Sequence, residues 1–195
     1  MGFSMPACVR IPETIPVLIL VVTLALAGCS DPAANNRFEL SLVEAKWSSG
    51  WINVRCEQRL ALSNEARDAL IHGVPLTIEL QLRLRDTGSQ TRVVDEKSSY
   101  EIRYLPLINH YQLSSSRTAA VKTFPRLRHL LAELSTLNLS FETGILPSGD
   151  YELLARTHLD QQRMPPPMRL PILLSSNWRH DSSWSSWPVE IEPGA

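Results

Sequence analysis

Cysteine is scarce in this chain, which has three among its 195 residues. Cys8 and Cys29 lie near the amino terminus, and Cys56 is the only cysteine after them. A solitary thiol cannot form an intramolecular disulfide, and in an oxidising compartment it is safest when buried. Because Cys56 alternates with Ile52 and Val54, we predict that it fills the core behind one face of a strand and is not a reactive nucleophile.

An excess of charge of either sign is also lacking. The chain carries 19 Lys and Arg residues against 20 Asp and Glu residues, a formal net charge of −1. This balance disfavours nucleic acid or an anionic membrane patch as the main partner, because both attract proteins with an excess of basic residues.

Motifs with a known catalytic or ligand-binding mechanism are missing. The sequence has no glycine-rich phosphate loop, no Gly-x-Ser-x-Gly elbow and no Cys-x-x-Cys pair. His180, Asp181 and Ser182 are the residue types of a hydrolase triad, but consecutive residues do not place their groups in the required relay, so we interpret them as a polar loop. The five histidines lack metal-site spacing. We therefore predict no catalytic residue, no metal and no cofactor. The histidines are His72, His110, His129, His158 and His180.

No apolar run near the amino terminus is long enough to cross a bilayer. Residues 17–27 would form a helix of about 16 Å, against a hydrocarbon core of roughly 30 Å. The run ends in Leu26-Ala27-Gly28-Cys29, which is typical of a bacterial lipobox. We therefore predict a signal peptide at 1–28 and a lipidated Cys29. A plain secreted protein and a short membrane anchor are the alternatives.

Acylation of Cys29 would hold the protein on a membrane, since two or more lipid chains bind a bilayer stably. Residues 29–37 are polar and are predicted to be a tether that reaches less than roughly 30 Å when fully extended. Ser30 stands where an Asp would favour retention at the inner membrane, so the outer membrane is favoured, with the domain facing the periplasm.

A single domain is predicted from 38 to 191. Its clearest strand is 76–85, where apolar and polar residues alternate without a fault. Helices are predicted at about 64–72, with Ser63 as N-cap, and at 124–137, where leucines recur at helical spacing. Further strands are predicted at 38–43, 51–60, 99–104, 108–113 and 151–159, and an extended connector at 165–167.

Many short strands with only two helical insertions predict a mostly β fold. We expect an antiparallel β-sandwich that is immunoglobulin-like in class.

The order of several segments resembles the proteobacterial exported family known as Domain of Unknown Function 4390. The resemblance implies a secreted single domain without assigned activity, so it transfers no site residue. Proteins of the family resemble neighbours of sensor-kinase genes, which hints at a signalling partner, whereas the lipobox departs from relatives with plain signals. The resemblance rests on Gly73-Val74-Pro75 and the strand after it, Ile102-Arg103-Tyr104 to His110-Tyr111, the leucine-rich helix, Leu146-Pro147-Ser148-Gly149-Asp150-Tyr151, Arg163-Met164-Pro165 and the final Trp cluster.

Three of the five tryptophans, Trp178, Trp184 and Trp187, lie within ten positions among polar residues. They either fold back to cap the end of the sandwich or form an exposed aromatic patch that binds a protein, glycan or lipid interface.

Two classes of function follow from these observations. We favour a non-enzymatic, periplasm-facing lipoprotein that acts as an interaction or accessory module of the cell envelope, with a possible link to a sensor kinase. The alternative is a weak hydrolase, or a carbohydrate-active or glycan-binding protein. It would use the Trp cluster or dispersed acids such as Glu101 or Asp160.

Overall fold

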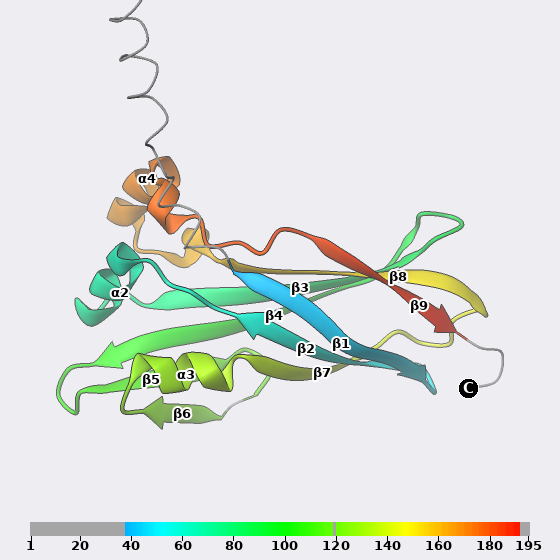
Figure 1. Ribbon diagram of the computed structural model, residues 1–195, viewed down its shortest axis with the longest axis horizontal. Coiled ribbons are helices and arrows are strands. Elements are labelled where there is room, and N and C mark those ends of the chain that lie inside the picture. The colour runs from blue at the N-terminus through cyan, green and yellow to red at the C-terminus, as the bar shows by residue number, and fades with distance from the viewer. Residues whose placement is uncertain (1–37, 119, 192–195) are drawn as a thin grey trace, which may run out of the picture. The chain divides into compact units, whose positions relative to one another are not determined.

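The computed structural model describes residues 38–118 and 120–191. The predicted signal peptide, Cys29 and tether lie outside these residues and stay predictions. The described part consists mainly of strands in two antiparallel sheets, with three α-helices beside them (Figure 1). The predicted mostly β fold with two antiparallel sheets is therefore confirmed.

The smaller sheet has three strands in the order β1-β2-β7. β1 and β2 form an antiparallel hairpin from the strands predicted at 38–43 and 51–60. Its turn residues, Ser49 and Gly50, have φ values of 50° and 83°, and positive φ at both positions matches a type I′ turn. The strands are β1 (Glu39–Ser48), β2 (Trp51–Arg59) and β7 (Thr136–Glu142).

The larger sheet has six strands in the order β6-β5-β4-β3-β8-β9. Its centre is β3, the faultlessly alternating segment, which pairs with β4 on one side and β8 on the other. β3 to β6 follow one another as neighbours, and the chain then crosses to the smaller sheet for β7. The strands are β3 (Leu76–Asp86), β4 (Arg92–Leu105), β5 (His110–Ser115), β6 (Val121–Phe124), β8 (Gly149–Leu159) and β9 (Ser185–Ile191).

The hydrophobic core lies between the two sheets. Every second residue of β2 is buried, and Cys56 is fully buried as predicted. The opposing face of β3 supplies Leu80, which is 1 % exposed, and other leucines of similar burial. Each fully buried side chain of this kind contributes about 1.5–3 kcal/mol, so β3 is the strand on which the packing depends most.

One polar bridge crosses the core. Gln58 of β2 is 6 % exposed and points toward the larger sheet, where its Oε1 accepts a hydrogen bond of 2.9 Å from the Thr157 hydroxyl of β8. Its Nε2 donates to the carbonyl of Leu134 at 2.7 Å. The side chain thus ties both sheets and the segment before β7 together.

The helices agree only in part with the sequence prediction. α2 (Asn64–Ile71) begins as expected, because the Ser63 hydroxyl accepts from the Ala66 amide at 3.1 Å. α3 (Leu127–Glu133) is shorter than the predicted 124–137, since both ends of that range belong to β6 and β7.

A third helix stands where the sequence predicts an extended connector. α4 (Pro166–Leu174) has a proline at its first position, where the missing N–H is not needed for an intrahelical bond. Two short 3₁₀ turns flank it, η3 (Gln161–Arg163) and η4 (Ser176–Trp178). No helix in the described ranges is long and apolar enough to span a bilayer.

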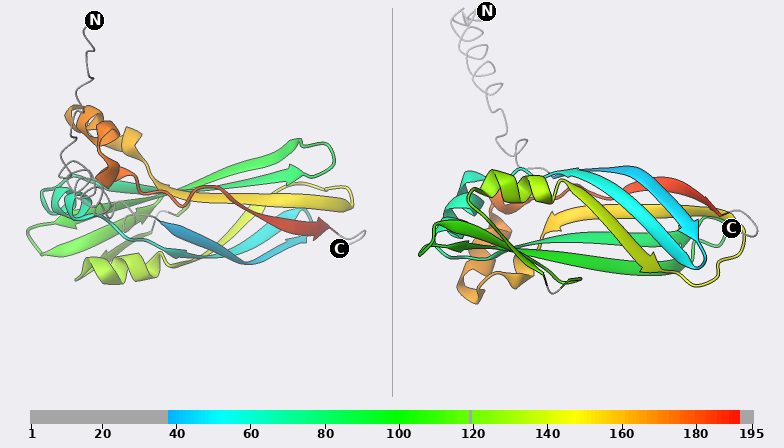
Figure 2. Two further views of the ribbon diagram at one scale, coloured as in Figure 1. Left: turned by 45° about the horizontal axis from the view of Figure 1, so that its top comes forward. Right: turned by 90° about the horizontal axis from the view of Figure 1, so that it is seen from below.

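α2, α4 and the start of β1 gather at one end of the sheets (Figure 2). The rings of Phe38 and His180 lie 5.4 Å apart between their centroids, which joins the residue before β1 to the segment after α4. The loop between β7 and β8 lies at the other end (Figure 1).

Candidate functional site

The outer face of the six-stranded sheet carries polar side chains where β4, β3 and β8 lie side by side. Glu79 and Gln81 of β3 point away from the core, yet each is only 8 % exposed. A buried carboxylate is costly unless it is paired or hydrogen-bonded. This face therefore differs from an ordinary solvated sheet surface.

Glu79 has three polar neighbours on this face. The Gln81 Nε2 donates to its Oε1 at 2.6 Å, and the Lys97 Nζ of β4 lies 3.7 Å from the same oxygen. The His158 Nε2 of β8 lies 4.0 Å away. The Gln81 amide and the Lys97 cation thus compensate the buried carboxylate.

Trp184 reaches this face from the segment before β9. Two residues, Ser183 and Trp184, stand opposite Arg156 just before the regular pairing starts at Ser185. Ser183 has a left-handed φ of 61°, as in β-bulges that redirect a strand. The bulge and the strand alternation together direct the indole to the outer side.

The indole of Trp184 lies over two arginines. The guanidinium carbon of Arg83 is 4.2 Å from the ring centroid, and that of Arg156 is 6.0 Å away. The ring is half-buried, so part of it stays open to a partner. Such cation–π contacts contribute about 0.5–1 kcal/mol at exposed sites.

Arg156 is held in place by the carboxylate of Asp181, which lies three residues before Trp184. Its Nε donates to both oxygens of Asp181, at 2.9 and 3.1 Å, and its Nη2 donates to Oδ2. Burial alone would raise the pKa of Asp181, but hydrogen bonds from Arg156 and from the Ser183 amide outweigh it and hold that pKa below its usual value. The pair stays charged near neutral pH and orients the guanidinium under the ring.

Further ion pairs continue the row along β3. Arg83 Nε lies 3.2 Å from Asp95 Oδ2, which also accepts from Arg92 at 2.9 Å. Arg85 pairs with Glu152, and this contact lowers the pKa of Glu152. Exposed pairs of this kind contribute about 0–1 kcal/mol each, so their main effect is to hold planar guanidinium groups in place.

His158 is half-buried beside this network, with a side chain that is 19 % exposed. Burial lowers its pKa most, and the charge of Arg156 lowers it further, whereas Glu79, Asp181 and Asp160 act in the opposite direction. Its Nδ1 is buried without a hydrogen-bond partner. The imidazole is therefore held in its neutral form.

His180 is buried at the α2 and α4 end. Its Nε2 accepts a hydrogen bond of 2.9 Å from the Ser63 amide, so the neutral ring carries its proton on Nδ1. Burial lowers the pKa of His180, opposed by the Trp178 carbonyl and by Glu65.

We expect the free energy of unfolding to fall as the pH falls from about 7.5 to about 5.5. The reason is that the pKa values of His158 and His180 in the folded protein lie below the value of about 6.5 in the unfolded chain. The unfolded chain then takes up protons that the folded chain excludes. Urea unfolding at the two pH values measures the loss. A variant with His158→Gln and His180→Gln should show a flatter dependence, and an unchanged slope would contradict this assignment.

The three tryptophans of the predicted patch have different surroundings. Trp178 is 7 % exposed within η4, and Trp187 pairs with Leu153 and packs against the core. Only Trp184 lies on the polar outer face. Trp184 and Trp187 are three residues apart on an extended chain, which places them on opposite sides. The odd spacing of Trp184 and Trp187 was the signal in the sequence that the two rings face opposite sides.

The polar groups of residues 180–182 have separate partners. His180 accepts from Ser63 and Asp181 binds Arg156, while the Ser182 hydroxyl accepts from the Thr157 amide at 2.9 Å. No hydrogen bond joins the three side chains to one another among those found in the described ranges. The arrangement agrees with a polar loop and not with a catalytic relay.

The dispersed acids also stay apart. Glu101 stands opposite Thr77 on one side of β3, and the Asp160 amide donates to the Thr77 carbonyl on the other side at 2.8 Å. Two strand spacings of about 4.8 Å separate their backbones. Glu101 pairs with Arg103, and Asp160 pairs with Arg163 at 3.3 Å.

Cys56 has no polar role. Burial raises the pKa of its thiol to about 11, so the sulfur stays protonated at neutral pH. It is a free, buried cysteine, as the sequence predicted.

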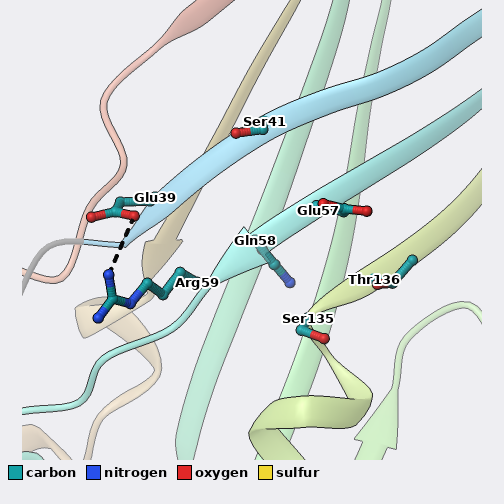
Figure 3. Close-up of a pocket in the computed structure, with 7 residues that line it drawn as sticks. All are labelled: Glu39, Ser41, Glu57, Gln58, Arg59, Ser135 and Thr136. Atoms are coloured by element: carbon teal, nitrogen blue, oxygen red, sulfur yellow. Dashed lines mark ion pairs between the residues drawn. The ribbon is translucent and has the colours of Figure 1, made fainter.

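A shallow polar hollow of about 290 Å³ lies on the smaller sheet. Figure 3 shows Glu39 and Arg59 facing each other at one side, 3.9 Å apart, while Gln58 turns away into the core. Its side chains therefore do not converge on one point. The hollow is lined by Glu39, Ser41, Glu57, Gln58, Arg59, Ser135 and Thr136. In residues 38–118 and 120–191, no group of three His, Cys, Asp or Glu side chains is placed to hold a metal ion.

The fold and the outer face of the six-stranded sheet define a mostly β domain. That face carries several arginines, two of which lie under Trp184. Residues 35–188 match the family described as Domain of unknown function (DUF4390), and the chain belongs to that family. No curated protein and no solved structure matched the chain.

Proposed function

We propose that this protein is a lipid-anchored, non-enzymatic binding module of the bacterial cell envelope. Acyl chains on Cys29 would hold it on the periplasmic side of a membrane, with the outer membrane favoured over the inner one. The Leu26-Ala27-Gly28-Cys29 motif supports the anchor. The outer face around Trp184 would bind an envelope protein, for which the family resemblance suggests a membrane sensor kinase.

One observation carries the binding role. The half-buried ring of Trp184 lies over Arg83 and Arg156, whose guanidinium groups are already held by Asp95 and Asp181. Trp and Arg are the residues that contribute most at protein interfaces, and fixed side chains lose less entropy when a partner binds. The planar guanidinium groups beside the ring suit a partner that presents carboxylates or aromatic rings.

We expect Trp184→Ala to weaken binding of the partner by about tenfold or more, the loss typical of a central interface tryptophan. A photo-crosslinking residue at Ser186, the next outward position of the same strand, should capture one dominant protein in intact cells. Trp184→Ala should remove that adduct, and Trp184→Phe, which keeps a ring over the arginines, should retain part of it.

Two controls belong to this experiment. The same crosslinker at Asn53, exposed on the outer face of the smaller sheet, should not give the adduct. Cys29→Ser should move the protein to the soluble periplasmic fraction. An adduct that persists in Trp184→Ala would contradict the proposed binding face. Membrane retention of Cys29→Ser after an alkaline carbonate wash, which strips peripherally bound protein, would contradict the anchor.

A further inference from the structure

α4 has an exposed apolar edge. Leu170 is 73 % exposed and Leu174 is 87 % exposed, and residues four apart lie on the same side of a helix. Ile172, which is 2 % exposed, and the half-buried Met168 attach the helix to the core. The buried side of α4 thus fixes the helix on the core, and its leucine edge has no partner among the described residues.

This edge differs from other exposed apolar residues of the chain. Ile145, at 93 % exposure, stands alone in a loop, and isolated exposed residues are normal in soluble proteins and need no partner. Leu107 and Ile108, at 101 % and 57 % exposure, are adjacent in the turn between β4 and β5, so they do not share one side of a helix. Two leucines in consecutive turns of one helix form a continuous surface instead.

The segment that contains α4 is basic, although the whole chain is charge-balanced and Glu65 of the neighbouring α2 accepts a hydrogen bond from Asn177. Residues 161–179 contain three arginines and no acidic residue, and the three side chains, of Arg163, Arg169 and Arg179, are exposed. Arg163 also pairs with Asp160, which leaves the other two without an acidic neighbour from their own segment. Arginines beside an apolar helix edge are typical of helices that lie in the headgroup region of an anionic bilayer.

The chain length between Cys29 and the fold places α4 near the anchor. Cys29 precedes Phe38 by nine residues, which reach no more than about 30 Å. The Phe38 ring lies 5.4 Å from that of His180, two residues after η4, and η4 directly follows α4. β8 has 11 residues and extends about 36 Å toward the opposite end. The α4 end is therefore the end closest to the lipid.

We propose that the leucine edge of α4 is a second membrane contact, with Leu170 and Leu174 inserted among the headgroups of an anionic phospholipid bilayer beside the acylated Cys29. This proposal rests on the anchor of the proposed function. It adds a fixed orientation: the loop between β7 and β8 points away from the bilayer, and the outer face around Trp184 stands clear of the lipid at the side of the sheet.

The test uses the full, acylated protein in vesicles of phosphatidylethanolamine and phosphatidylglycerol. Leu174→Cys carries an environment-sensitive fluorophore, and a fraction of the lipids has brominated acyl chains that quench it. Labelling is specific, because Cys56 is buried and Cys29 is acylated. Ile145→Cys with the same label is the matched control, since it is equally exposed but lies at the other end.

We expect quenching at least about threefold stronger for Leu174→Cys than for Ile145→Cys, because interfacial helices place their apolar face at the acyl boundary. Adding Leu170→Gln, or replacing the anionic lipid by phosphatidylcholine, should reduce it. Equal quenching at both positions in protein that floats with the vesicles would overturn the α4 contact and leave the anchor intact. Protein that fails to float would overturn the anchor, and the α4 contact with it.

Discussion

Replacing Leu80 by alanine is expected to lower the free energy of unfolding by about 2–5 kcal/mol. Leu80 is 1 % exposed in the central strand of the larger sheet and faces the smaller sheet. The substitution removes buried methyl groups and leaves a cavity, because strands paired on both sides cannot close over it. Urea unfolding followed by circular dichroism measures the loss.

Leu107→Ala is the matched control for this prediction. It is the same substitution at a position that is 101 % exposed, in the turn between β4 and β5. We expect a change within about 0.5 kcal/mol, as for most surface substitutions. A loss below about 1 kcal/mol for Leu80→Ala would mean that the two sheets do not pack as described.

Gln58→Ala should lower the free energy of unfolding by about 2–4 kcal/mol, because it leaves the Leu134 carbonyl and the Thr157 hydroxyl buried without their partner. A buried polar atom that loses its hydrogen bond keeps its desolvation penalty, and the lost side chain also leaves a space. Denaturant unfolding of both proteins gives the difference. Asn53→Ala, on the exposed face of the same strand, should change little.

A double-mutant cycle separates the bridge from simple packing. Thr157→Val removes the hydroxyl while it keeps the shape of the side chain, and Gln58→Leu replaces the amide with an apolar group. If the two side chains bond across the core, the losses should be non-additive by about 0.5–3 kcal/mol. Additive losses would show that Gln58 and Thr157 act independently.

The strands β1, β2, β3 and β8 could be predicted because their pattern is local, whereas β6, β9 and the first half of β4 were not predicted. The alternation in β3 and the neighbours of Cys56 set which residues face the core without knowledge of any partner strand. α2 was equally predictable, because Ser63 supplies a cap within one turn.

The segment around α3 shows where a local pattern is ambiguous. Leu134 and Leu137 fit a helix, but Leu137 also alternates with Leu139 and Phe141, which fits a strand. Pairing of β7 with β2, about 80 residues earlier, decides between them. α4 was missed for another reason, since a run of prolines predicts extended chain unless a helix begins within it.

The candidate site depends on contacts that no local pattern reveals. Alternation in β3 predicts that Glu79, Gln81 and Arg83 share a face, but not that neighbours bury Glu79 and Gln81 to 8 % exposure. The position of Trp184 over Arg83 requires β8 to lie between β3 and the carboxyl-terminal segment. The tryptophan spacing alone could have separated Trp184 from Trp187.

The buried thiol of Cys56 reports whether the two sheets have separated. Burial keeps it protonated, with a pKa of about 11, so oxidants and alkylating agents react with it only when the two sheets separate. Once modified, the larger side chain overpacks the space between the sheets, which costs about 1–3 kcal/mol of stability. A modification made during a brief opening would thereby persist as a loss of stability in that molecule.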